Sequence, residues 1–143
     1  MKRSAVILFI ISIIILSAAA AFAANPLEEL KTPAELSNWT RTTSSEEVID
    51  YLTQVAKNSG GRIRMEFIAW TTKGNLVPLL VIGTPAPKSP EEVPAEKAIA
   101  YVNCNIHSGE VEGKESMLIF AREVALGQHD DLLKDLVILL APN

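Results

Sequence analysis

The chain has 143 residues, 48% of them hydrophobic, and a formal net charge of −4. This length is enough for one domain. The acidic balance argues against nucleic acid as a partner, because proteins that bind nucleic acid usually carry basic patches. A single cysteine, Cys104, excludes an internal disulfide.

The first 23 residues have the pattern of a signal peptide. Lys2 and Arg3 precede an apolar run over residues 5–15, and small residues lead to a cleavage site of the A-x-A type at 21–23. We therefore expect this segment to be removed and the protein to be exported, that is, secreted or periplasmic, without membrane contact after cleavage. An uncleaved anchor is the alternative, because residues 5–24 give about 20 largely apolar positions, enough to span a bilayer. Cleavage removes two basic residues and changes the net charge from −4 to −6.

Residues 24–44 form a polar, proline-broken lead-in segment without a clear hydrophobic period, and we expect the domain itself to span 45–143. At its start, Ser44 and Glu47 have the spacing of a capping box. Apolar residues then recur at helical spacing up to a Ser-Gly-Gly stop at 59–61. This pattern predicts a surface helix with one buried face.

Two apolar runs and a turn follow the helix and predict an antiparallel hairpin. Residues 62–71 and 76–82 are the expected strands, and 72–75 is a turn that contains glycine. Pro78 has no amide donor, so the second strand should be edge-like or bulged at that position.

A proline-rich loop over 83–97 leads to a third strand at 98–106, which is apolar enough to be central in the sheet. Cys104 shares a face of this strand with Val102 and Ile106. We therefore expect Cys104 to be a small core residue rather than a reactive or metal-binding thiol.

A helix and a fourth strand complete the order of elements. Met117, Phe120, Ala121 and Val124 have the spacing of a helix stripe that faces the core. The apolar run at 136–140 fits a buried parallel strand. Strand, helix and strand together predict a βαβ unit with a right-handed crossover. The expected fold class is therefore α/β, with a partial mixed β-sheet and flanking helices.

The turn between the third strand and this helix carries the strongest functional signal. His107 and Glu110 lie three residues apart beyond the carboxyl end of a strand, where open α/β sheets place their sites. One imidazole and one carboxylate suit catalytic zinc, and Gly109 is expected to let the backbone turn sharply between them. The alternative is an exposed histidine beside an ordinary glutamate at a helix start. His129, in a polar loop, is expected to be a surface residue and not a ligand.

The order of these elements resembles the amino-terminal part of the zinc carboxypeptidases of the carboxypeptidase A type. The resemblance covers roughly 45–143 and rests on the helix, the hairpin, the strand that leads into Asn-Ile-His-Ser-Gly-Glu at 105–110, and the closing Ala-Pro-Asn. It implies that His107 and Glu110 bind zinc. It also implies that the zinc polarises the carbonyl of a peptide or protein substrate and lowers the pKa of its bound water. A second histidine ligand, a glutamate base and arginines for the substrate carboxylate are expected downstream of Asn143.

The resemblance thus implies a metallocarboxypeptidase, of which this chain is a truncated or split part without a catalytic base, and we expect it to be inactive alone. A zinc amidohydrolase that deacylates N-acyl amino acids shares the ligand turn and is the first alternative. The second alternative is a non-catalytic exported binding domain, in which His107 and Glu110 are ordinary surface residues. A half-sheet is also expected to expose an apolar edge, which favours aggregation.

Overall fold

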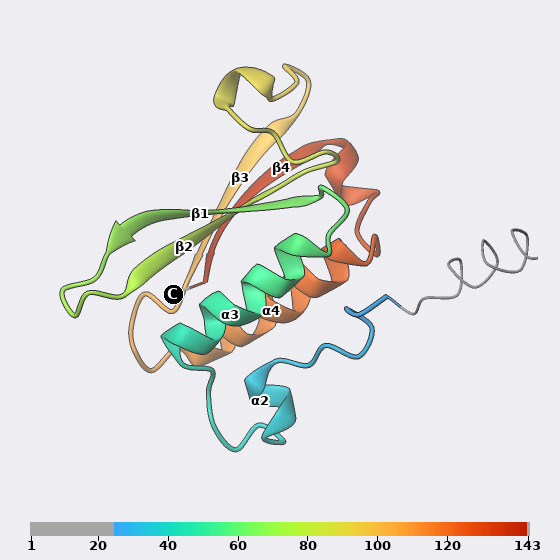
Figure 1. The fold of residues 1–143 in the computed structure, drawn as a ribbon. Helices are drawn as coiled ribbons and strands as arrows, with labels where there is room; N and C mark the ends of the chain where they lie inside the picture. The colour runs from blue at the N-terminus through green and yellow to red at the C-terminus, as the bar shows by residue number, and fades with distance from the viewer. Residues whose placement is uncertain (1–24, 143) are drawn as a thin grey trace, which may run out of the picture.

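The computed structural model describes residues 25–142, so the predicted signal peptide lies outside the described residues. Two helices precede a β-hairpin, and a strand, a helix and a last strand follow it (Figure 1). In chain order they are α2 (Pro33–Leu36), α3 (Ser45–Lys57), β1 (Ile63–Trp70), β2 (Leu76–Ile82), the 3-10 turn η1 (Pro90–Glu92), β3 (Ala98–Cys104), α4 (Val111–Ala125), the 3-10 turn η2 (Leu132–Lys134) and β4 (Leu136–Pro142).

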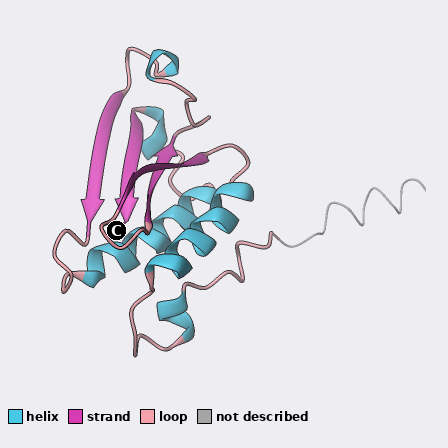
Figure 2. Cartoon of the chain, turned by 60° about the vertical axis from the view of Figure 1, so that its left-hand side comes forward, coloured by secondary structure: helices cyan, strands magenta, loops and turns pink. Residues whose placement is uncertain are grey.

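The four strands form one mixed sheet with the order β1-β2-β4-β3. β1 pairs with β2 and β2 with β4 in antiparallel fashion, whereas β3 and β4 are parallel. Helices α3 and α4 lie side by side and cover one face of this sheet (Figures 1 and 2). The predicted α/β class with a mixed sheet and flanking helices is confirmed.

The expected central position of the third strand is wrong. β3 lies at the edge of the sheet that residues 25–142 form, because β4 inserts between β2 and β3. Ile99 and Tyr101 on its outer face are 56% and 59% exposed. The apolar composition of the strand indicated that it could be buried on both faces, but composition does not say which strands become its neighbours.

The hairpin is confirmed, and Pro78 is accommodated as its chemistry requires. Pro78 pairs with Phe67, and the register of β1 shifts directly after Phe67. Pairing between β2 and β4 starts only at Leu80. The proline therefore lies in the half of β2 that has β1 as its single neighbour, where a missing amide interrupts no ladder with β4.

The core lies between the sheet and the two long helices. Ser44 and Glu47 form the predicted capping box of α3, whose residues Val48, Leu52 and Val55 are buried. On α4 the fully buried positions are Leu118, Ala121 and Val124, whereas Met117 and Phe120 are only partly buried against the same cluster. The stripe on α4 is thus displaced by about one residue from the predicted one.

The lead-in segment packs against α4 instead of extending away from it. Leu27, Thr32 and Ala34 are essentially inaccessible to solvent. The guanidinium of Arg122 on α4 donates to both carboxylate oxygens of Glu35, at 2.7 and 3.0 Å. Among the described helices, none has the length and apolar character needed to cross a bilayer.

Candidate metal centre

The turn that carries the predicted ligands begins where β3 ends. Asn105 adopts a left-handed backbone conformation with φ of 56°, which Asn tolerates better than most residues because its short polar side chain can bond locally. The Glu110 amide then donates to the His107 carbonyl at 3.0 Å, which closes the turn. Glu110 occupies the N-cap position of α4, and its side chain makes no capping hydrogen bond. Its carboxylate is therefore not used by the helix.

The turn brings the two predicted ligands together. His107 Nδ1 and Glu110 Oε1 are 2.9 Å apart. Their side chains are 77% and 58% exposed, so solvent or an ion can reach them. The imidazole nitrogen and the carboxylate oxygen thus lie within hydrogen-bond distance of each other on an exposed turn.

The pair fits zinc in the chemistry of its donors and falls short in their number. Zinc bonds to His nitrogen and carboxylate oxygen are about 2.0–2.2 Å long, so two donors of a tetrahedral ion lie about 3.4 Å apart. Exposed side chains reach that separation by a small rotation. Within residues 25–142, however, no cluster of three His, Cys, Asp or Glu residues could hold a metal ion. The described residues therefore fit two of the three protein ligands that catalytic zinc usually has.

Gly109 lies in the turn between the two predicted ligands, but the turn does not use the left-handed conformation that glycine permits. Its φ lies outside the left-handed region, and a Cβ added there would meet no heavy atom within 4 Å. The backbone reversal that needs a permissive residue occurs at Asn105, before His107. The sequence drew attention to the glycine because Asn is a weaker marker of left-handed backbone than Gly.

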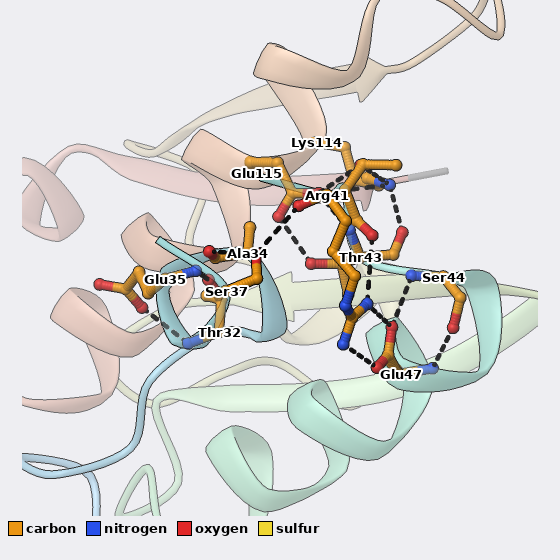
Figure 3. A network of polar contacts seen from close by, with 11 residues as sticks. Thr32, Ala34, Glu35, Ser37, Arg41, Thr43, Ser44, Glu47, Lys114 and Glu115 are labelled. Carbon is orange, nitrogen blue, oxygen red and sulfur yellow. Dashed lines mark hydrogen bonds and ion pairs between the residues drawn. The ribbon is translucent and has the colours of Figure 1, made fainter. Parts of the chain in front are cut away.

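A buried charged network next to the turn was not anticipated from the sequence (Figure 3). Lys114 and Glu115, on the first two turns of α4, are each 5% exposed. Glu115 Oε1 accepts from the Thr43 amide at 2.7 Å and from the Thr42 hydroxyl at 2.6 Å, while Oε2 accepts from the Thr43 hydroxyl at 2.7 Å. Lys114 Nζ donates to the Thr42 hydroxyl at 2.8 Å and to the Thr43 carbonyl.

Ionisation of Glu115 follows from these partners. Burial raises the pKa of its carboxyl, but the hydrogen bonds from Thr42 and Thr43 outweigh burial, and the net result is a lowered pKa. Nearby Lys114, 3.4 Å from Glu115 Oε1, acts in the same direction. The sequence did contain a signal for the burial of Lys114, because this residue continues the helical spacing of the buried residues Leu118 and Ala121.

A pocket of about 300 Å³ borders the turn. Its wall includes Asn105 before the ligand pair and Lys114 after it, together with apolar side chains from α3 and β2. The Asn105 Oδ1 atom is buried and has no hydrogen-bond partner among the described residues. The turn therefore lies beside a mostly apolar hollow with a few polar groups, which is the usual composition of a ligand pocket.

The other two residues considered from the sequence lie apart from the ligand pair. Cys104 is partly buried, and burial raises the pKa of its thiol. A Cβ added at Gly113 would lie 3.4 Å from the Cys104 Cβ, so the first turn of α4 packs closely on this side chain. His129 Nε2 is 2.9 Å from Glu123 Oε2, and its ring packs against Phe120 with centroids 5.0 Å apart.

Comparisons with known proteins identify the family and the fold. A family model described as zinc carboxypeptidase matches residues 48–143. A search of curated proteins found no match. Solved structures share the fold at low sequence identity. Carboxypeptidase A from Helicoverpa armigera has a TM-score of 0.61 and 20% identity, over 89% of this chain and 28% of its own.

Two further structures lead to the same conclusion. Thrombin activatable fibrinolysis inhibitor has a TM-score of 0.59 and 17% identity, over 71% of this chain and 25% of its own. The bovine form of that inhibitor, in complex with tick carboxypeptidase inhibitor, has a TM-score of 0.57 and 16% identity, over 71% of this chain and 30% of its own. The chain thus spans less than a third of the length of these similar structures. Since the family model covers two thirds of its residues, the chain belongs to the zinc carboxypeptidase family.

Proposed function

We propose that this chain supplies two ligands, His107 and Glu110, to the catalytic zinc of a carboxypeptidase that removes residues from the carboxyl end of peptides. The observation that supports the proposal is the 2.9 Å separation of His107 Nδ1 and Glu110 Oε1 on an exposed turn. The turn follows β3, in the crevice where open α/β sheets bind their ligands. Family membership adds zinc and a peptide substrate to this geometry.

The described residues have a limited set of tasks in this reaction. Bound zinc supplies Lewis-acid chemistry, which polarises a carbonyl and lowers the pKa of water. His107 offers a ring nitrogen, and Glu110 offers a carboxylate that no helix amide occupies. The pocket beside the turn gives a peptide side chain an apolar surface. Export of the protein, with removal of residues 1–23, is part of the proposal.

The proposal leaves the third ligand, the general base and the groups that bind the substrate carboxylate to protein outside residues 25–142. The similar structures are three to four times as long as the part that this chain matches. Two ligands without a base give a weak site. We therefore expect the 143-residue chain on its own to cleave peptides slowly or not at all, and its metal affinity to be the property to measure.

Calorimetric titration with zinc at pH 7.5 tests the proposal on the chain, with and without the substitutions His107→Ala and Glu110→Ala. Each substitution should weaken zinc binding at least about tenfold, because each removes one of two ligands. A matched control exists in the same protein, since His129 and Glu123 form a second His–Glu pair with the same 2.9 Å separation. His129→Ala and Glu123→Ala should leave the affinity unchanged.

The opposite pattern would overturn the proposal. If zinc binding persists without His107 and Glu110, or disappears without His129 and Glu123, the turn is not the metal centre. The chain is then better described as a binding domain with a carboxypeptidase-like fold.

A further inference from the structure

The lead-in segment contacts α4 just after the metal turn, through groups that are almost fully buried. Thr43 is 1% exposed, and Lys114 and Glu115 are 5% exposed. Both oxygens of Glu115 are engaged by Thr42 and Thr43, as Figure 3 shows for the contacts of Thr43. Every partner of Glu115 in these contacts is a donor, so the network is complete only with an ionised carboxylate.

The start of α4 has few other restraints. Glu110 at its N-cap makes no side-chain capping bond, and such a bond is a common way to fix a helix start. Gly113 packs closely on Cys104, which is an apolar contact without a hydrogen bond. Lys114 lies one helical turn after Glu110, on the side where the lead-in segment passes. The polar network is therefore the directional restraint closest to the turn.

We infer that Thr43, acting through Glu115 and Lys114, is a positioning residue that holds the start of α4 and thereby keeps the Glu110 carboxylate beside His107. The inference deepens the proposed function and rests on it for its meaning, because the held pair is the proposed metal centre. Thr42 and Thr43 lie outside residues 48–143, the part that matches the family model. The lead-in segment thus helps to position the site, because it holds the start of α4.

The test uses the full chain and the substitutions Thr43→Val and Thr43→Ser. Valine keeps the shape of the side chain and removes the hydroxyl that donates to Glu115 Oε2, whereas serine keeps the hydroxyl. Thr53→Val is the matched control, because Thr53 is exposed on α3 and its hydroxyl donates to the Ile49 carbonyl of the same helix.

Two readouts are measured for each variant. The first, without metal, is hydrogen exchange at the Glu110 amide, which bonds the His107 carbonyl, relative to exchange at the buried Leu118. The second is the zinc dissociation constant. Thr43→Val should accelerate exchange at Glu110 about tenfold more than at Leu118 and weaken zinc binding about tenfold. Thr43→Ser should restore both to within about twofold, and Thr53→Val should change neither.

The outcomes separate this inference from the proposed function. If Thr43→Val accelerates exchange equally at Glu110 and Leu118, the network is merely structural and the inference is wrong, whatever zinc does. If Thr43→Val accelerates exchange selectively at Glu110, but zinc binding is unchanged in Thr43→Val, His107→Ala and Glu110→Ala alike, the turn is held as inferred and the proposed metal centre fails.

Discussion

Two polar side-chain pairs that lie within nine residues of each other have opposite surroundings. The side chains of His107 and Glu110 are 77% and 58% exposed, while those of Lys114 and Glu115 are both 6% exposed. Within residues 25–142, the side chains of the first pair bond to each other, and the second pair is saturated by Thr42 and Thr43. The difference shows why residue type alone does not mark a site. Both oxygens of the buried Glu115 carboxylate are engaged by threonine donors, whereas the Glu110 carboxylate is exposed and contacts only His107 among the described residues, so a ligand can reach it.

The largest effect should come from Glu115→Ala, which removes the acceptor at the centre of the buried pair. Lys114 and the Thr43 donors then stay buried with unsatisfied groups, and the free energy of unfolding should fall by about 3–5 kcal/mol. Urea unfolding followed by circular dichroism measures this change. Glu112→Ala, at an exposed position on the same helix, should cost less than about 1 kcal/mol. Similar losses for the two variants would mean that burial does not distinguish them.

A second contrast uses two Arg–Glu pairs of equal length and unequal exposure. Arg122 and Glu35 are 15% and 20% exposed, whereas Arg41 and Glu47 are 52% and 34% exposed, and both pairs approach to 2.7 Å. Arg122→Met should lower the free energy of unfolding by about 2–3 kcal/mol, because it leaves a partly buried carboxylate unpaired. Arg41→Met should cost clearly less, because solvent screens this exposed pair. Chemical denaturation of both variants at one salt concentration provides the comparison, and equal costs would contradict it.

The stability of the protein should depend on pH through Glu35 and Glu115. Arg122 lowers the pKa of Glu35. Burial raises the pKa of Glu115, but the bonds from Thr42 and Thr43 outweigh it and lower the pKa from the ordinary value of 4.5. A lowered folded-state pKa contributes stability above the unfolded value, and this contribution is lost as pH falls through the folded value. The free energy of unfolding should therefore decline as pH is lowered below 4.5.

Urea titrations between about pH 7 and about pH 3 measure this decline, a range that spans the unfolded pKa of a glutamate. The Glu115→Gln protein should start less stable and decline less steeply than the unmodified protein, because one of the carboxyls with a lowered pKa is gone. An equally steep decline would exclude Glu115 as a contributor.

The smallest effect concerns the backbone of the turn. Gly109→Ala should change the free energy of unfolding by less than about 0.5 kcal/mol, since the position is open and its φ is not left-handed. Asn105→Ala should cost about 1 kcal/mol, because alanine is strained in the left-handed conformation of Asn105. Thermal unfolding of the two variants and of Asn105→Gly, which should be close to neutral, checks this difference. A larger loss of unfolding free energy for Gly109→Ala than for Asn105→Ala would show that the backbone reversal depends on Gly109.

Local patterns in the sequence were enough for most of the fold. The capping box at Ser44, the hairpin around 72–75 and the parallel pairing of β3 with β4 all follow from spacing that neighbouring residues set. The order of strands did not follow, because β4 reaches its place between β2 and β3 through contacts that are distant in sequence. Composition therefore predicted that β3 was a strand but not that it was an edge.

The same distinction holds at the site. The proximity of His107 and Glu110 could be predicted because the two residues lie three positions apart on one turn. The partners of Glu115 could not, since Thr42 and Thr43 precede it by more than 70 residues in a segment without periodicity. Residue spacing predicts short-range geometry such as that of His107 and Glu110. It does not predict the contacts between Glu115 and the lead-in segment, which are distant in sequence.

The single thiol of the chain can serve as a reporter of this support. Cys104 lies beneath the first turn of α4, so close that a Cβ added at Gly113 would contact it. Its side chain is partly covered and its raised pKa slows thiolate chemistry. Alkylation of the unmodified protein should accelerate whenever the helix start lifts from the sheet, so a simple thiol assay can follow that opening in solution without any engineered label.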